Sequence, residues 1–336
     1  MELSSAVLDE ILSQLSSARA VLLVGHMAAD GDSLGSCLAL GHLLQGIGVC
    51  VYTVAAEKVP ARYKFLPGAE SIVTPSEGLP SDWDVVVVLD CGDLRRTGLL
   101  ESLGRANGEG IVARNGARII NIDHHRSNQG TLGTAWVDSG FAAVGQQILA
   151  LARYAAWEIT PDAATCLYTA LATDTGFFRH GNTSAHVLRD AAYLLEAGAN
   201  ARLVVENCVE RKTLAELCLI REALSTLSQE CDGRVTVMEI PFAVFTQCGA
   251  DEDEVEGMIE YARSVPGTEI AVLLRAVQTD ITKVSLRGRG SRDVSVIATS
   301  FGGGGHRQAA GCTVHLPLSD VRAAVIAAVR QVIACA

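Results

Sequence analysis

Three short apolar segments each lead directly into residues that can bind a metal ion, and this repetition constrains the fold more than any other feature. The segments and the residues that follow them are Val21–Val24 with His26, Val85–Leu89 with Asp90, and Ile119–Ile122 with Asp123. Uninterrupted runs of β-branched and aliphatic residues are typical of strands buried on both faces of a parallel sheet. Since the carboxyl ends of such strands open onto one crevice, we expect these polar side chains to meet there.

Helix-period segments alternate with the predicted strands. Leu34–Gln45 and Phe141–Tyr154 have helical spacing, and Pro161 begins another helix at a position where its missing N–H costs nothing. This alternation predicts an α/β domain in which helices flank a mainly parallel sheet.

The 336 residues are long enough for two hydrophobic cores. A mostly helical pattern from Ser184 to Leu227 gives way to further strands, for example at Arg234–Ile240 and Ile270–Val277. We therefore predict a first domain over residues 1–195, a helical linker over 196–215, and a smaller α+β domain over 216–336.

Composition limits the class of partner. With 38 acidic and 27 basic residues the net charge is −11, which repels a long polyanion and argues against long duplex nucleic acid. The first 17 residues carry acids rather than a basic segment before an apolar stretch, and no segment reaches the roughly 20 apolar residues of a membrane span. We expect a cytoplasmic protein that does not enter membranes.

Ten cysteines are scattered through the chain without a C-x-x-C pair, and several lie within apolar runs. This pattern favours small buried thiols in a reducing compartment over ligands, nucleophiles or a disulfide framework.

The segment after the first predicted strand places His26, Asp30 and Asp32 within seven residues, among glycines that let the backbone turn. Taken alone, an Asp-Gly-Asp sequence is equally consistent with a turn whose aspartate caps the next helix. The third strand adds His124 and His125, and a predicted helix carries Asp174 near its C-terminus, where a negative charge opposes the helix dipole.

Ligand-type residues at four successive element ends favour a metal site over four unrelated turns and caps. Imidazole nitrogen mixed with carboxylate oxygen suits manganese, iron or zinc better than calcium, and the lack of thiolates argues against structural zinc. So many candidate ligands fit a pair of divalent cations.

At this point the chain resembles a known family. HMAADGDSLGS, VLDCGD, NIDHHRSN and TALATDTGFF resemble, in order and spacing, the four motifs of the DHH phosphoesterases, and GGGGHRQAAGC resembles the signature loop of their DHH-associated C-terminal domain. The resemblance covers essentially the whole chain and is strongest to the bacterial nanoRNases and pAp phosphatases. Ala29 stands where many relatives have proline, which changes no ligand.

The resemblance implies a role for each matching residue. His26 and Asp30 would hold one manganese ion, Asp32, His124 and Asp174 the other, and Asp90 would bridge the two. His125 would face the substrate phosphate, and Asp123 would support this loop without binding a metal ion directly.

The glycine run of the C-terminal motif is a second candidate site. Gly304 and Gly305 offer backbone N–H groups, and His306 and Arg307 add cationic side chains, which together suit a phosphate, although a simple hairpin would have the same sequence. Arg96, after the Asp90 strand, is a further candidate phosphate ligand or a solvated surface group.

The implied function is manganese-dependent hydrolysis of very short oligoribonucleotides, of the 3′-phosphate of pAp, or of both, by metal-activated water in a cleft between the domains. A cyclic-di-AMP or pApA phosphodiesterase is the alternative, since the same metal site would serve it. A RecJ-type exonuclease, a polyphosphatase and a non-catalytic nucleotide-binding regulator are weaker alternatives. Homodimerisation is expected from the resemblance alone.

Overall fold

The computed structural model describes residues 5–75, 78–107, 110–113, 116–255 and 257–334. The chain divides into two compact units between Arg211 and Lys212. This division lies inside residues 196–215, the predicted linker.

The first unit is built on a five-stranded sheet. Its strands are β1 (Ala20–Val24), β2 (Cys50–Val54), β3 (Val85–Leu89), β6 (Arg118–Asp123) and β7 (Thr134–Val137). All neighbours are parallel in the order β2-β1-β3-β6-β7, which confirms the predicted parallel α/β domain. The chain runs from β1 to one side and then to β3 on the other, so the strand order reverses between β1 and β3. Ligand crevices in open α/β sheets lie at such reversals.

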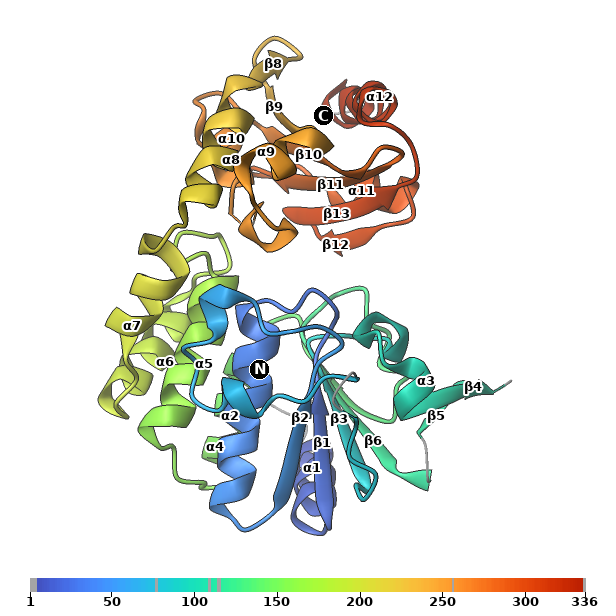
Figure 1. Ribbon diagram of the computed structural model, residues 1–336. Coiled ribbons are helices and arrows are strands. Elements are labelled where there is room, and N and C mark those ends of the chain that lie inside the picture. Colours follow the sequence, from blue (N-terminus) through green and yellow to red (C-terminus); the bar gives the residue numbers. More distant parts are fainter. Residues whose placement is uncertain (1–4, 76–77, 108–109, 114–115, 256, 335–336) are drawn as a thin grey trace. The chain divides into compact units, whose positions relative to one another are not determined.

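Helices cover one face of this sheet. They are α1 (Ser5–Ser16), α2 (Gly31–Gly46), α4 (Val144–Tyr154), α5 (Pro161–Asp174), α6 (Ala185–Glu196) and α7 (Ala201–Val205), and Figure 1 shows α2, α4 and α5 on the same side. Val21, Leu23 and Val87 point into the core beneath these helices, whereas Leu22 and Val86 point into a smaller core on the other face. The central strands are thus apolar on both faces, as their sequences predict.

Short elements complete the first unit. They are the 3₁₀ turns η1 (Ala61–Tyr63), η2 (Ala69–Ser71) and η4 (Leu94–Thr97), the helix α3 (Leu100–Leu103), the hairpin of β4 (Gly104–Asn107) and β5 (Gly110–Ala113), and the π-helical turn η6 (Glu206–Glu210). The η4 turn and α3 lie over the second face of the sheet, where Leu94 and Leu103 join the smaller core.

The second unit is a mixed sheet in the order β12-β13-β11-β10-β9-β8 with helices on both faces. Its elements are α8 (Leu214–Ser225), β8 (Ser228–Glu230), β9 (Val235–Ile240), α9 (Phe242–Cys248), η7 (Glu252–Val255), α10 (Ile259–Ser264), β10 (Ile270–Gln278), β11 (Ile281–Gly288), α11 (Ser295–Ser300), β12 (Gly304–His306), β13 (Ala309–Val314) and α12 (Leu318–Ala334).

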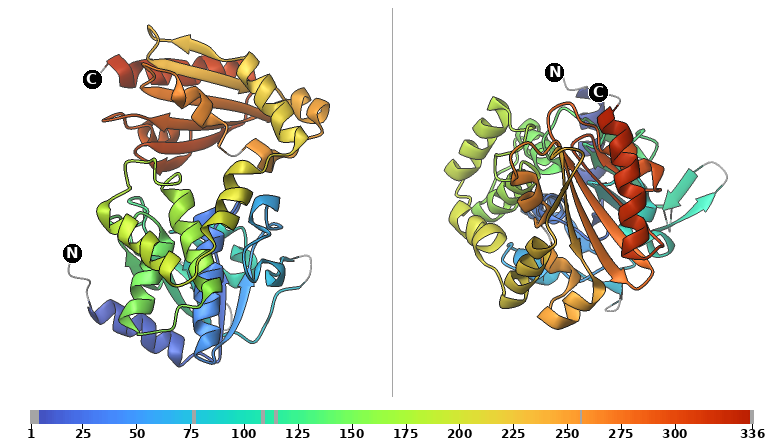
Figure 2. Two further views of the ribbon diagram at one scale, coloured as in Figure 1. Left: turned by 90° about the vertical axis from the view of Figure 1, so that its left-hand side faces the viewer. Right: turned by 90° about the horizontal axis from the view of Figure 1, so that it is seen from above.

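Alternating side chains of the second sheet point into two hydrophobic cores, one on each face. Val272 and Leu274 of β10 belong to the core that includes α11 and α12, whereas Ala271 and Leu273 belong to the core that includes α8, α9 and α10. The right-hand view of Figure 2 shows α12, at the red end of the chain, lying along one face. The predicted α+β architecture of this part is confirmed.

The expectation that every cysteine is a thiol is wrong for one pair. Cys218 of α8 and Cys248 of α9 form a disulfide, because the packing of these two helices brings their Cα atoms to 5.5 Å. Four of the remaining cysteines are buried, as predicted, but Cys50 is exposed. Across the described residues, no helix combines the length and the apolar character that crossing a bilayer requires.

Candidate metal centre

The loop after β1 supplies the first two candidate ligands. His26 Nδ1 donates to the Met27 carbonyl oxygen over 2.7 Å, which turns Nε2 towards the carboxylates of Asp90, at 3.3 Å, and Asp30, at 3.8 Å. Asp30 also accepts hydrogen bonds from two backbone N–H groups in the first turn of α2, so it caps that helix. The cap and the contact with His26 coexist, and capping therefore does not exclude ligation.

Asp32 lies in the first turn of α2 with only 1% of its surface exposed. Its Oδ2 accepts from the backbone N–H of Val144 at 2.7 Å, and its Oδ1 accepts from Gly145 N–H at 2.9 Å and from the Ser36 hydroxyl at 3.0 Å. Asp32 Oδ2 also lies 3.7 Å from His124 Nε2. The carboxylate is thus held at both oxygens beside the imidazole.

Asp90 follows β3 in a left-handed backbone conformation, with φ +57°. Its backbone N–H donates to the Ile122 carbonyl oxygen, which ties it to the end of β6. Its carboxylate lies 3.3 Å from His26, 3.5 Å from His124 and 3.6 Å from His125, and its buried Oδ1 has no hydrogen-bond partner among the described residues. A buried carboxylate oxygen that lacks a donor and faces imidazoles suits a cation.

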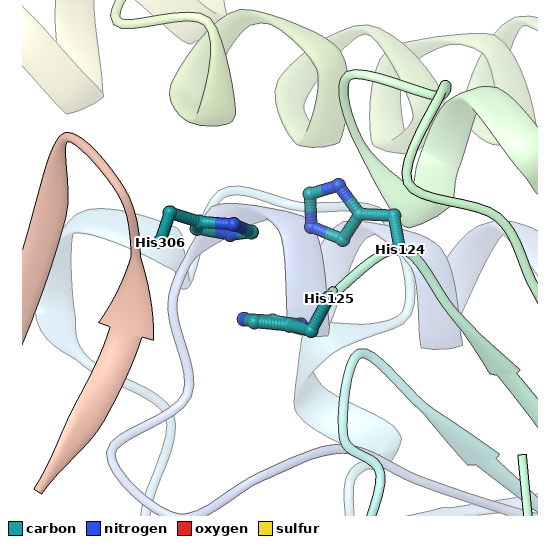
Figure 3. A group of neighbouring side chains, drawn as sticks. All are labelled: His124, His125 and His306. Carbon is teal, nitrogen blue, oxygen red and sulfur yellow. The ribbon is translucent and has the colours of Figure 1, made fainter. Parts of the chain in front are cut away.

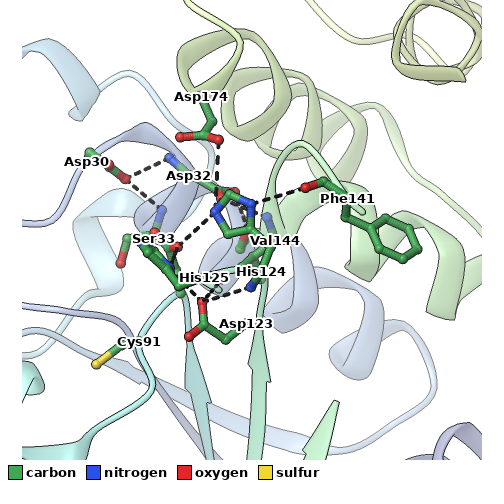
Figure 4. Close-up of polar contacts among 12 residues, drawn as sticks. Asp30, Asp32, Ser33, Cys91, Asp123, His124, His125, Phe141, Val144 and Asp174 are labelled. Atoms are coloured by element: carbon green, nitrogen blue, oxygen red, sulfur yellow. Dashed lines mark hydrogen bonds and ion pairs between the residues drawn. The ribbon is translucent and has the colours of Figure 1, made fainter. Parts of the chain in front are cut away.

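Asp123 ends β6 and organises the two histidines after it. Its Oδ1 accepts from the backbone N–H of His124 and from His125 Nδ1, at 2.8 and 2.7 Å, while its Oδ2 accepts from Asn128. His124 Nδ1 donates to the Phe141 carbonyl oxygen at 3.3 Å, which orients Nε2 towards the acids. The two rings stand nearly edge to face, 5.0 Å apart; Figure 3 labels both, together with His306 of β12, and Figure 4 traces the polar contacts.

Asp174 is the last residue of α5, and its carboxylate lies 3.9 Å from His124 Nε2. Burial, together with the charges of Asp90 and Asp30, outweighs the nearby histidines and raises the pKa of Asp174 to about 7. An ionised carboxylate at a helix C-terminus among other acids needs a compensating positive charge, and without one it takes up a proton more readily.

The candidate ligand atoms gather in overlapping groups whose members lie within 4.8 Å of one another. The groups formed wholly within the first unit are His26, Asp30 and Asp90; Asp32, His124 and Asp174; and Asp90, Asp123 and His125. Asp90 belongs to two of these groups, and its carboxylate approaches His124, which belongs to the group with Asp32 and Asp174. This arrangement of imidazole nitrogens and carboxylate oxygens matches what divalent first-row metals bind.

Without metal, two histidines of the site are protonated at neutral pH. Burial opposes charge on His26 and His124, but the close approach of Asp90 and of the other surrounding carboxylates outweighs it and raises their pKa values to about 10 and about 11. Burial likewise opposes charge on Asp90, yet His124 and His26 hold its pKa well below the usual range. The imidazoles therefore carry the positive charge that a cation would bring.

The glycine-rich C-terminal loop forms a hairpin. Gly304–His306 make the edge strand β12, which pairs with β13 in a hairpin. A Cβ on Gly303 would lie 2.1 Å from the Gly311 carbonyl oxygen, whereas a Cβ on Gly304 would meet nothing within 4 Å. Packing therefore requires a glycine at position 303 but not at position 304. Arg307 is exposed and donates to the Ser291 carbonyl oxygen.

Arg96 lies in η4 with an exposed side chain, and its carbonyl oxygen accepts from the Met27 N–H at 2.8 Å. The backbone of Arg96 thus fastens the loop that carries His26. Its neighbour Arg95 pairs with Asp93 at 2.6 Å.

Several residues around the site had no signal that singled them out in the sequence. Asn128 bridges Asp123 and Asn121, and Asn182 donates to the carbonyl oxygens of Ala142 and Asp174. Asparagines in loops are too common to identify in this way, although Asn128 does fall within the NIDHHRSN motif.

Comparison with known proteins agrees with this geometry. A model of the N-terminal domain of the DHH family matches residues 20–171, and a model of the DHHA1 domain matches residues 232–334. A Thermus thermophilus protein named bifunctional oligoribonuclease and PAP phosphatase NrnA is 33% identical over 315 residues, or 93% of this chain and 89% of that protein. The chain belongs to the DHH family. DHH proteins are phosphoesterases that use divalent metal ions, so the chain is a phosphoester hydrolase.

Two further relatives extend the match. A Bacillus subtilis protein of the same name is 23% identical and covers 91% of this chain and 93% of its own length. The crystal structure of an exopolyphosphatase-related protein from Bacteroides fragilis has a TM-score of 0.86 and 22% identity, covering 98% of this chain and 96% of that one. At this identity the structural match supports the fold alone.

Proposed function

We propose that this DHH phosphoesterase hydrolyses very short oligoribonucleotides and the 3′-phosphate of pAp, using two manganese ions. The observation that carries the proposal is the position of Asp90 between two groups of candidate ligands. The name of the Thermus thermophilus relative, similar over 93% of this chain, supports the choice of substrates. The net charge of −11 supports short substrates over long polyanions.

The proposed ligands fall into two subsites that share Asp90. His26 and Asp30 belong to the first subsite, and Asp32, His124 and Asp174 to the second. When bound, a pair of divalent cations supplies an activated water and neutralises charge that develops on the phosphoryl oxygens.

His125 is proposed to contact the substrate phosphate. Its Nδ1 donates to Asp123, which fixes both the ring orientation and the position of the proton on the ring. Asp123 is held in turn by Asn128, so this pair is rigid. Asp123 therefore acts through His125 rather than on the substrate.

A hydrolysis panel tests the proposal. The full chain, loaded with Mn²⁺, is assayed against pAp, a dinucleotide, a pentanucleotide, cyclic-di-AMP and a long single-stranded RNA. Preference for pAp and the short RNAs is expected. Preference for cyclic-di-AMP would replace the proposed substrate, and equal cleavage of long RNA would contradict the restriction to short chains.

We also propose that the β12 hairpin binds substrate through Gly304, Gly305, His306 and Arg307, and that Arg96 contributes a phosphate contact. His306→Ala should mainly raise KM. Gly304→Ala should leave the unfolding temperature unchanged, because its Cβ meets nothing, yet raise KM if substrate approaches this backbone closely. An unchanged KM in both variants would exclude the hairpin from substrate binding.

A further inference from the structure

One short segment is linked to all three candidate ligands of the second subsite, to two of them directly and to the third through an asparagine. We name residues 141–145 the α4 turn, because they lead into that helix. The carbonyl oxygen of Phe141 accepts from His124, and the N–H groups of Val144 and Gly145 donate to the two carboxylate oxygens of Asp32.

Asp32 acts as the missing cap of α4. The N-cap residue of this helix, Ala143, has no side chain that can accept a hydrogen bond, and the carboxylate of Asp32 takes that place from another helix. The third ligand is linked through Asn182, whose amide donates to the carbonyl oxygens of Ala142 and Asp174 at 3.3 and 3.2 Å. A shift of the α4 turn would therefore displace the whole second subsite.

A buried polar network holds the α4 turn in place. Gln146 accepts from the Ala142 N–H at 2.9 Å through Oε1 and donates to Asp190 at 2.8 Å through Nε2. Asp190, on α6, is 2% exposed and also accepts from Arg153. An amide has one accepting and one donating end, so Gln146 joins a backbone donor to a charged acceptor.

We propose that Gln146 and Asp190 are positioning residues for the cation subsite formed by Asp32, His124 and Asp174. The inference rests on the metal centre proposed above. Among the described residues, the hydrogen bonds made by His26, Asp30 and Asp90 involve the β1 loop, the start of α2 and β6 rather than the α4 turn. Loss of the network should thus affect one subsite and spare the other.

Exchanging the amide and the carboxylate between positions 146 and 190 distinguishes a positioning role of this hydrogen bond from a general loss of stability. Gln146→Glu sets a carboxylate against Asp190 and should push the side chain away from the Ala142 N–H. Adding Asp190→Asn supplies an amide that donates to the new carboxylate, whose other oxygen can again accept from Ala142. Residues 146 and 190 of the double variant together still carry one negative charge beside Arg153, so Mn²⁺ binding should recover.

Metal binding to the full-length, metal-free protein is the readout. Calorimetric titration with Mn²⁺ should show two sites in the unchanged protein. In Gln146→Glu we expect affinity to fall about 10- to 100-fold at one site only, as for other residues that orient metal ligands. The double variant should return to within about twofold.

Asp84→Asn is the matched control. Asp84 accepts from the N–H groups of Arg19 and Ala20 where β1 begins, at the other end of the sheet. Asp84→Asn changes a carboxylate to an amide, as Asp190→Asn does. It should lower the unfolding temperature of the protein and leave both Mn²⁺ affinities unchanged. If Gln146→Glu does not fold, Gln146→Met, which can neither accept from Ala142 nor donate to Asp190, should show the same loss at one site.

Three outcomes would overturn the inference. They are equal weakening of Mn²⁺ binding at both sites, Mn²⁺ binding in both Gln146 variants that equals that of the unchanged protein, and no recovery of Mn²⁺ affinity in the double variant. Two sites in the unchanged protein would still support the metal centre in each of these cases. Absence of Mn²⁺ binding to the unchanged protein would overturn the metal centre, and the inference with it.

Discussion

Asp90 combines an uncommon backbone conformation with a central place among the candidate ligands. A left-handed φ is strained for most residues with a Cβ, but aspartate and asparagine tolerate it best because their short polar side chains bond locally. Strain of this kind persists only where the surroundings hold it, and it gathers at functional sites. The backbone of Asp90 is held by Ile122 of the neighbouring strand.

Asp90→Asn should abolish most turnover while preserving the backbone. It keeps a residue that accepts φ +57° but removes the charge, so we expect kcat to fall by about 10²- to 10³-fold and Mn²⁺ affinity to drop. Asp90→Ala should be less stable than Asp90→Asn by about 1–2 kcal/mol, because alanine disfavours the left-handed conformation. Steady-state kinetics and urea unfolding measure both effects. Undiminished turnover in either variant would remove Asp90 from the reaction.

Protons on His26 and His124 should compete with metal. Their pKa values of about 10 and about 11 mean that both imidazoles are protonated at neutral pH in the metal-free protein, whereas a cation requires the neutral ring. Mn²⁺ affinity should therefore rise with pH below these values, by about tenfold per pH unit for each proton expelled. Calorimetry in two buffers of different ionisation enthalpy counts the protons. Binding that does not depend on pH would contradict the ligand assignment.

At the scale of elements, glycines set the distances between the helices that carry ligands. A Cβ on Gly35 of α2 would lie 2.5 Å from the Cys166 carbonyl oxygen of α5, and a Cβ on Gly145 of α4 would lie 2.4 Å from the Ala170 Cβ. The close packing of α2 and α5 brings Asp32 and Asp174 to the same imidazole.

Gly35→Ala should separate these helices. The clash is with backbone, so relief requires a helix shift, and we expect a loss of about 1–3 kcal/mol in the free energy of unfolding with reduced activity. Gly46→Ala is the control in the same helix: its Cβ meets nothing within 4 Å, so the variant should be unchanged or stabilised by up to about 1 kcal/mol. Equal stability of the two variants would show that α2 and α5 adjust without cost.

The strands, and the gathering of candidate ligands where they end, could be predicted because an apolar run that ends on an acid or a histidine is a local pattern. The network of Gln146 and Asp190 could not be predicted, since it depends on the contact of α4 with α6, and glutamine has no preferred function in a sequence. The Cys218–Cys248 disulfide was missed for the same reason, because only the packing of α8 on α9 pairs residues 30 positions apart.

At the scale of the whole molecule, the two units have separate cores and separate means of stabilisation. The candidate metal ligands His26 to Asp174 lie in the first unit, and the disulfide lies in the second. The acidic total charge of the chain disfavours long polyanions.

Metal and reductant should therefore act on different parts of the chain. Mn²⁺ at about a hundred times its Kd should slow amide exchange in the first unit, corresponding to about 2.7 kcal/mol of stabilisation. Reduction of Cys218–Cys248 should speed exchange in the second unit, by an amount that corresponds to about 2–4 kcal/mol. Hydrogen exchange read by mass spectrometry resolves the two. Protection by Mn²⁺ confined to the second unit would contradict the proposed location of the metal centre.

The candidate ligands begin at His26 and end at Asp174, and this spread has a consequence for the life of the newly made chain. A growing polypeptide lacks a complete second subsite until α5 has left the ribosome, so a cation at that subsite cannot template the early steps of folding. Bound to the finished unit, it would act mainly on the rate of unfolding, as interactions absent from the folding transition state do. Metal supply would then govern how long the enzyme survives once made, more than how quickly it forms.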